Sequence, residues 1–281
     1  MGRASLRTTS RWDRCASVNP EQIGLSTACF YPHTLTEDAL DLAAELGFSL
    51  VEVFLQTESE YRLDFAAVLA QRARASGVRI HSLHLYATLF DLWSPYARMR
   101  EETRARFLQL LEVATHVGAR ALTWHGLRLG IDDPALVGPF LESTAWAAEA
   151  AHAAGLTLCV ENVSWCYLRR PEHVAVLKGL GAPLGFTFDS FQAAESGVAP
   201  EALIAAMNGA LTTVHLADFA PAGPRHLLPG RGIMDWPGVF AALRRVAYAG
   251  PLLIEIAGLD APETLLEARR FIEAGLRSCS R

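Results

Sequence analysis

Four polar residues lie where apolar, β-rich segments of the chain end. The runs LTLCVEN, LGFTFDS, LTTVHLAD and PLLIEIAG carry Glu161, Asp189, His215 and Glu255, respectively. A buried carboxylate without a partner costs several kcal/mol or becomes protonated. One cation shared by these side chains removes that cost for all of them. The pattern therefore predicts a single divalent metal site on Glu161, Asp189, His215 and Glu255.

The residue types indicate which metal this site prefers. Three carboxylates and one imidazole form an oxygen-rich, moderately hard ligand set. Such a set favours Mn2+ first, with Mg2+ or Co2+ as alternatives and Zn2+ as a further candidate. The competing interpretation is structural, because a single acidic residue at a strand end often caps a helix or pairs with an arginine.

Further polar and aromatic residues occupy similar positions. His84, His125 and Asp218 also end apolar runs, and for the two histidines a site role and a hydrogen-bonded core role stay open. His81 lies three residues before His84, so strand alternation predicts that it points to the opposite face. Five aromatic residues either pack in the core or form an apolar wall against the carbon face of a sugar-like ligand. They are Phe54, Trp124, Trp165, Phe191 and Trp236.

These residues need a scaffold that brings many strand ends together. Short β-rich runs alternate with longer segments of helical periodicity from Gln22 onward. Strands joined by helical crossovers form a parallel sheet, and eight such units predict a single-domain (β/α)8 TIM barrel with the polar residues at its mouth. The expected strands cover residues 22–27, 49–55, 78–85, 120–127, 156–162, 184–190, 211–218 and 251–258. A doubly wound fold is the alternative, but no GxGxxG motif follows the first run.

The composition argues against several classes of function. The net charge of -5 gives no global attraction for nucleic acid or for an anionic membrane. Lys178 is the single lysine and lies at a probable helix end, which argues against imine chemistry. Five scattered cysteines predict reduced thiols and a cytoplasmic protein, and no apolar run is long enough to span a membrane. Residues 1–20 are expected to be a disordered extension, with the barrel domain at 21–281.

Six stretches of the chain resemble the xylose isomerase-like TIM barrel superfamily, which groups sugar isomerases and epimerases with endonuclease IV-type DNA repair enzymes. They are HSLHLY, TWHG, CVEN, FTFDSFQ, VHLAD and PGRGIMDWPGVFAALRRVAYAGPLLIEI. The PGRG-x-x-DW segment is similar to ketose 3-epimerases and hydroxypyruvate isomerase-like members. The resemblance places Glu161, Asp189, His215 and Glu255 on the single-metal ligands of the superfamily.

The DNA repair branch uses additional ligands for three zinc ions. His84, His125 and His226 match ligands of that branch. Gln192, however, stands where the branch has a histidine, and Pro224 stands where it has an aspartate. These two departures predict one metal instead of three. Gln192 also departs from standard ketose 3-epimerases, where a histidine contacts the substrate. The identity of the sugar substrate is therefore left open.

The resemblance implies a small polyhydroxy carbonyl substrate and metal-assisted proton abstraction. Glu161 and Glu255 are the expected acid and base on opposite faces of the substrate. Proton return to the same carbon gives an epimer, and return to the neighbouring carbon gives an isomer. The expected substrate contacts are His84, His125, Gln192, Arg225, His226, Arg231 and Trp124.

Three other functions start from the same residues. A dehydratase of a cyclic keto-polyol, of the inosose or dehydroshikimate type, begins with the same proton abstraction. A non-catalytic sugar-binding barrel would keep the metal without turnover, and an endonuclease IV-like repair enzyme is the least favoured option. Superfamily members often form dimers or tetramers, so a homo-oligomer is a further expectation.

Overall fold

The computed structural model describes residues 20–85, 91–128, 134–222, 225–256, 258–259 and 261–278. Eight parallel strands form a closed barrel in which each strand pairs with its neighbours in sequence and β8 pairs with β1. The strands are β1 (Ile23–Ser26), β2 (Leu50–Phe54), β3 (Arg79–His84), β4 (Ala121–Trp124), β5 (Thr157–Glu161), β6 (Leu184–Asp189), β7 (Leu211–Leu216) and β8 (Leu252–Ile254). Each one lies within an expected strand segment, and the predicted single-domain (β/α)8 barrel is confirmed.

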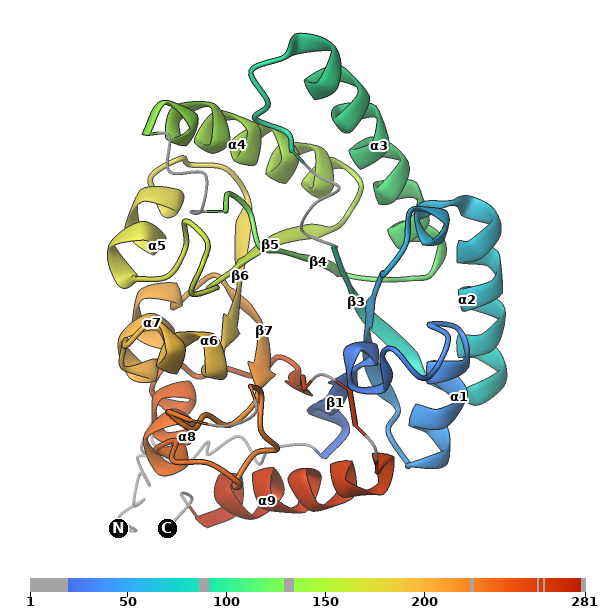
Figure 1. Cartoon of the computed structure of the whole chain (residues 1–281), viewed down its shortest axis with the longest axis vertical. Helices are drawn as coiled ribbons and strands as arrows, with labels where there is room; N and C mark the ends of the chain where they lie inside the picture. The colour runs from blue at the N-terminus through green and yellow to red at the C-terminus, as the bar shows by residue number, and fades with distance from the viewer. Residues whose placement is uncertain are drawn as a thin grey trace, which may run out of the picture.

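Helices surround the strands and cover the outside of the barrel (Figure 1). They are α1 (Asp38–Glu45), α2 (Leu63–Ser76), α3 (Ala97–His116), α4 (Val137–Ala153), α5 (Pro171–Lys178), α6 (Ser190–Glu195), α7 (Pro200–Met207), α8 (Trp236–Arg245) and α9 (Leu265–Ser278). Short 3-10 helices add η1 (Pro20–Gln22), η2 (Thr27–Phe30), η3 (Glu58–Tyr61), η6 (Pro134–Leu136) and η7 (Pro262–Thr264). Within the described residues, none of the helices has the length and apolar character needed to cross a bilayer. Residues 1–19 of the expected extension lie outside the described part of the chain.

A glycine ends the helix that precedes β3. Gly77 caps α2 with a left-handed φ of 71°, and its backbone N–H bonds to the carbonyl of Ala73. A residue with a side chain is strained in this conformation, whereas glycine adopts it readily. The chain therefore turns into β3 within two residues of the end of α2.

The two faces of each strand differ in chemistry, as β6 illustrates. Phe186 and Phe188 are fully buried and belong to the apolar core that the strands share with the helices. Thr187 and Asp189 alternate with them and therefore face the barrel interior. Interior positions on other strands are also polar and buried, including Ser82 and Thr123. The barrel therefore encloses a polar column that leads up to the strand ends.

A bulge on β3 changes the direction of one histidine. The register between β2 and β3 shifts by one residue, so that His81 is an extra residue on β3. Its Nε2 lies 3.3 Å from Oγ1 of Thr213 on β7, a strand that does not neighbour β3. This contact passes through the interior, so the expectation that His81 points away from the His84 face was wrong. A bulge interrupts the strict alternation on which that expectation rested.

Candidate metal centre and active site

The strand ends bring the four predicted ligands together. Glu161 ends β5, Asp189 ends β6, His215 lies in β7, and Glu255 directly follows β8. One ligand atom from each of these side chains lies within 4.8 Å of the others. All four residues are buried, with exposed fractions of 0–8%. Four consecutive strands therefore direct ligand atoms at one point inside the mouth of the barrel.

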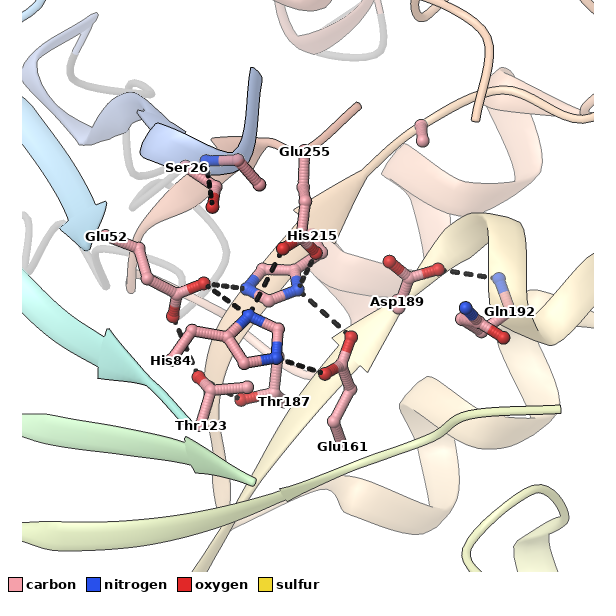
Figure 2. Close-up of polar contacts among 12 residues, drawn as sticks. Ser26, Glu52, His84, Thr123, Glu161, Thr187, Asp189, Gln192, His215 and Glu255 are labelled. Carbon is pink, nitrogen blue, oxygen red and sulfur yellow. Dashed lines mark hydrogen bonds and ion pairs between the residues drawn. The ribbon is translucent and has the colours of Figure 1, made fainter. Parts of the chain in front are cut away.

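His215 is the central member of this group. Its Nδ1 lies 3.1 Å from Oε1 of Glu161 and 2.5 Å from Oε2 of Glu255. Its Nε2 points the other way and lies 2.9 Å from Oε1 of Glu52. Figure 2 shows the rings of His84 and His215 between Glu52 on one side and Glu161 on the other. The two nitrogens of His215 therefore have distinct surroundings.

Glu52 is a site residue that the sequence analysis missed. It lies in β2, is fully buried, and contacts both His84 and His215. The signal was present in the sequence, because Glu52 interrupts the apolar run SLVEVFL as Glu161 interrupts LTLCVEN. A charge inside an apolar strand requires a partner wherever it lies along the strand, not only at its end.

The pair His84 and His125 approaches the group from β3 and from the segment after β4. Their Nε2 atoms lie 2.9 Å apart. They also lie 3.3 Å and 3.1 Å, respectively, from Oε2 of Glu161. Despite these contacts, that oxygen accepts no aligned hydrogen bond from any residue in the described ranges. Glu161 thus presents a buried oxygen that is available to a further partner.

The imidazoles hold most of the buried carboxylates in the charged form. Burial alone would raise the pKa of Glu161, but the charge of His215 lowers it well below its usual range. Burial also opposes ionisation of Glu255, yet His215 brings the pKa of this carboxyl down to about 2. In the opposite sense, burial would lower the pKa of His215, whereas Glu255 and Glu52 raise it well above its usual range. Charge pairing outweighs desolvation at each of these groups.

Asp189 shows that the imidazoles do not neutralise every buried carboxylate of the centre. Burial and then the charges of Glu161 and Glu255 raise the pKa of Asp189 well above its usual range. Its Oδ1 accepts a 2.6 Å hydrogen bond from the backbone N–H of Gln192 and so caps α6. The centre thus carries more carboxylate than its histidines neutralise, and a divalent cation bound by oxygen and nitrogen donors fits this set.

A pocket of about 430 Å³ opens above these residues. Five of the predicted substrate contacts line it, namely His84, His125, Gln192, Arg225 and His226. Phe54 and Trp165 form part of its wall, together with Tyr31 and Gln56, which the sequence analysis did not name. The pocket therefore combines aromatic surface with polar groups beside the carboxylates of Glu161, Asp189 and Glu255.

Two predicted substrate contacts lie elsewhere. Trp124 is 1% exposed and packs against Trp93 and Phe140, with ring centroids 5.7 Å and 6.0 Å away. The side chain of Arg231 is 65% exposed and pairs with Glu267 at 2.6 Å. Neither residue lines the pocket, because adjacent residues on a strand or loop point in different directions.

The loop from β7 to α8 is held by Asp218. This residue is fully buried, and its carboxylate accepts hydrogen bonds from four N–H groups at 2.8–3.0 Å. The donors are the backbone N–H groups of Phe219, Gly230 and Met234 and the indole N–H of Trp236. The anchored loop carries Arg225 and His226 to the pocket.

Interactions within the loop region fix the side chains at the rim. Arg225 pairs with Glu195 at 2.6 Å and lies over the ring of Phe191. His226 stacks on the same ring with centroids 3.9 Å apart. Oε1 of Gln192 accepts a 3.0 Å hydrogen bond from the backbone N–H of Ser164. Pro224, at which the sequence departs from the repair branch, lies outside the described residues.

The sequence from residue 40 to residue 275 matches the xylose isomerase-like TIM barrel family, and the chain belongs to this family. It is similar to the "Putative L-ribulose-5-phosphate 3-epimerase SgbU" of Escherichia coli K12, with 28% identity over 91% of this chain and 96% of that protein. It is also similar to the L-ribulose-5-phosphate 3-epimerase UlaE of Salmonella paratyphi C, with 26% identity over 86% and 90% of the two chains. Among solved structures, an L-ribulose 3-epimerase superposes with a TM-score of 0.76 at 19% identity, over 92% of this chain and 95% of the other, which shows a shared fold.

Proposed function

We propose that this protein is a divalent-metal-dependent sugar epimerase that acts on a ketose or a ketose phosphate. One observation carries the proposal: Glu161 and Glu255 approach one point at the pocket floor, where each lies beside Nδ1 of His215. Sugar 3-epimerases among the relatives support inversion at the carbon next to the carbonyl.

Glu161, Asp189, His215 and Glu255 would hold the metal. The close approach of their ligand atoms supports this assignment, as does Oε2 of Glu161, which accepts no aligned hydrogen bond from the described residues. A bound divalent cation supplies Lewis acidity, which polarises the substrate carbonyl and makes the neighbouring C–H easier to deprotonate. Mn2+ heads the candidates because three carboxylates outnumber the single imidazole.

Glu161 and Glu255 carry out the two proton transfers at the substrate carbon. They extend from β5 and β8, which β6 and β7 separate on one side of the barrel and β1–β4 separate on the other. One carboxylate removes the proton from one face of the substrate carbon, and the other glutamate delivers a proton to the opposite face. In the reverse reaction the two residues change roles.

The pocket wall positions the sugar for this exchange. Phe54 and Trp165 offer apolar surface for the carbon skeleton, and Gln192 and His226 offer polar groups for hydroxyls. Burial lowers the pKa of His226, which favours the neutral ring that both donates and accepts a hydrogen bond. Arg225 is positioned to meet hydroxyl or phosphate oxygens at the rim.

Solvent exchange tests the proposal directly. The Mn2+-loaded protein is incubated in D2O with a panel of free ketoses and ketose 5-phosphates, and the products are analysed by NMR and chromatography. We expect a product that is the C3 epimer, carries deuterium at C3 and retains every carbon and oxygen atom of the substrate. An aldose product with deuterium at C2 would indicate an isomerase, and loss of one water would indicate a dehydratase.

Two controls make this experiment decisive. Chelator-treated protein should show no exchange, and added Mn2+ should restore it. Glu273→Gln changes a carboxylate on α9 that pairs with Arg269 and is not among the described residues that line the pocket, so it should leave exchange intact. Absence of exchange with every sugar in the panel, in protein shown to hold metal, would refute the epimerase proposal.

A further inference from the structure

Glu52 lies beneath the candidate metal ligands and is not part of the pocket wall. It is fully buried in the middle of β2, whereas the pocket is lined by residues at the strand ends. A substrate in the pocket therefore meets other side chains. Any effect of Glu52 on the reaction must pass through the residues that it touches, which include His215.

The carboxylate of Glu52 is fixed in orientation by neighbouring strands. Its Oε2 accepts hydrogen bonds from the hydroxyls of Ser82 on β3 at 2.6 Å and Thr123 on β4 at 2.8 Å. Its Oε1 lies 3.2 Å from Nδ1 of His84 and 2.9 Å from Nε2 of His215. One oxygen is thus bound by hydroxyls while the other faces two imidazoles. Both hydroxyls bind Oε2, and both imidazoles lie within contact distance of Oε1.

The His215 ring requires a defined proton position to act as a ligand. A neutral imidazole carries one N–H, and only the other nitrogen has a lone pair for a metal. Nδ1 faces Glu161 and Glu255, the side where the ligand atoms converge. Nε2 is buried and makes no aligned hydrogen bond to any residue in the described part of the chain. Oε1 of Glu52 is the acceptor within reach of an N–H at that position.

We propose that Glu52 is a positioning residue that keeps the proton on Nε2 of His215 and so directs the Nδ1 lone pair at the metal. The inference rests on the proposed metal-dependent function and names a residue outside the ligand set. A carboxylate behind a metal-binding histidine fixes the ring tautomer and orientation and makes the ligand more basic. Loss of such a partner weakens metal binding by about 10- to 100-fold.

A metal titration tests this role without reference to turnover. Chelator-stripped wild type and Glu52→Gln are titrated with Mn2+, and the free ion is measured by electron paramagnetic resonance. We expect one ion per chain in both proteins and an affinity that is about 10- to 100-fold weaker in Glu52→Gln. Asp218→Asn is the matched control, because it removes the charge of another fully buried carboxylate that does not touch the ligands. Its affinity should stay within about twofold of wild type.

Nuclear magnetic resonance reports the proton itself. In Zn2+-loaded protein with 15N-labelled histidine, His215 should show a protected Nε2–H signal shifted downfield by the carboxylate. The signal should move upfield in Glu52→Gln and stay in place in Asp218→Asn. If Glu52→Gln does not fold, Glu52→Asp serves in its place, since the shorter side chain keeps the charge but withdraws Oε1 from the imidazoles. We expect about tenfold weaker Mn2+ binding in that variant.

Each other outcome overturns the inference in a recognisable way. Wild-type affinity in the Glu52 variants, or an equal loss in Asp218→Asn, would show that Glu52 has no specific effect on the metal. Two ions per chain in wild type and one in Glu52→Gln would make Glu52 a ligand, within the group it forms with His84, His215 and Glu255. Wild type that binds no Mn2+ would also remove the basis of the proposed function, whereas the first results leave that function intact.

Discussion

The mouth of the barrel and the anchor of the β7–α8 loop both bury carboxylates, but the partners of these carboxylates differ. Asp218 at the anchor is fully buried and accepts four hydrogen bonds from N–H groups, none of which titrates. Glu161 and Asp189 at the mouth are 2% and 1% exposed and lie among other carboxylates and imidazoles. At the anchor, uncharged N–H groups satisfy the carboxylate. At the mouth, the carboxylates depend on charged partners whose protonation can change.

This difference separates a carboxylate whose partners are all within the protein from the candidate metal ligands. Four N–H donors satisfy a carboxylate permanently, so Asp218 stabilises the loop and needs no ligand. At the mouth, burial and then the charges of Glu161 and Glu255 raise the pKa of Asp189 well above its usual range. Burial alone therefore does not identify a metal site; the identity of the partners does.

The largest expected effect is on catalysis at the mouth. Glu161→Gln and Glu255→Gln remove a proton acceptor and a metal ligand while keeping the size of the side chain. We expect kcat to fall by at least about 10²- to 10⁴-fold, the usual contribution of a general acid or base. Steady-state kinetics measure the loss, and circular dichroism should show an intact barrel. Full turnover in either variant would remove that glutamate from the mechanism and so contradict proton transfer by the pair.

The next largest expected effect is the loss of stability on metal removal, which should distinguish variants of the mouth from variants of the Asp218 anchor. At a free Mn2+ concentration of about 100 times Kd, binding should stabilise the folded protein by about 2.7 kcal/mol. Thermal melts with Mn2+ and with chelator should show this increment in wild type and also in Asp218→Asn, since the anchor does not contribute a ligand. Glu161→Gln should lose much of it. A missing increment in Asp218→Asn alone would mean that the anchor supports the metal centre.

The stability of the anchor itself gives a smaller effect. In Asp218→Asn, an amide N–H2 replaces one oxygen and faces N–H donors instead of accepting from them. Each buried donor left without an acceptor costs about 1–3 kcal/mol, so we expect a loss of roughly 2 kcal/mol in the free energy of unfolding. Urea denaturation of the chelated proteins measures it. Unchanged stability would show that the loop is held by other contacts.

The smallest expected effect concerns the rim of the pocket. Arg225 reaches the pocket from the anchored loop, whereas Arg231 on the same loop pairs with Glu267 outside it. For a ketose phosphate, Arg225→Gln should raise KM by about tenfold through the loss of a charge-assisted hydrogen bond. Arg231→Gln should leave KM unchanged, and neither variant should alter Mn2+ affinity. Equal effects of the two substitutions on KM would place the phosphate outside this pocket.

The sequence alone determined the architecture and identified the four candidate metal ligands. Alternating β-rich and helical segments predicted the closed barrel, because the period of apolar residues is a local property of the chain. The same reasoning placed Glu161, Asp189, His215 and Glu255 at one mouth, since parallel strands in a barrel end on the same side. The structure brings these four together and places five of the seven expected substrate contacts on the pocket wall.

Only the tertiary structure decided which side chains face one another across the barrel. Glu52 looked like an ordinary strand residue until β3 and β7 brought His84 and His215 against it. A bulge turned His81 inward, and packing withdrew Trp124 into the core. Spacing along one strand cannot specify contacts between strands that are distant in sequence, because these depend on register, bulges and the closure of the barrel.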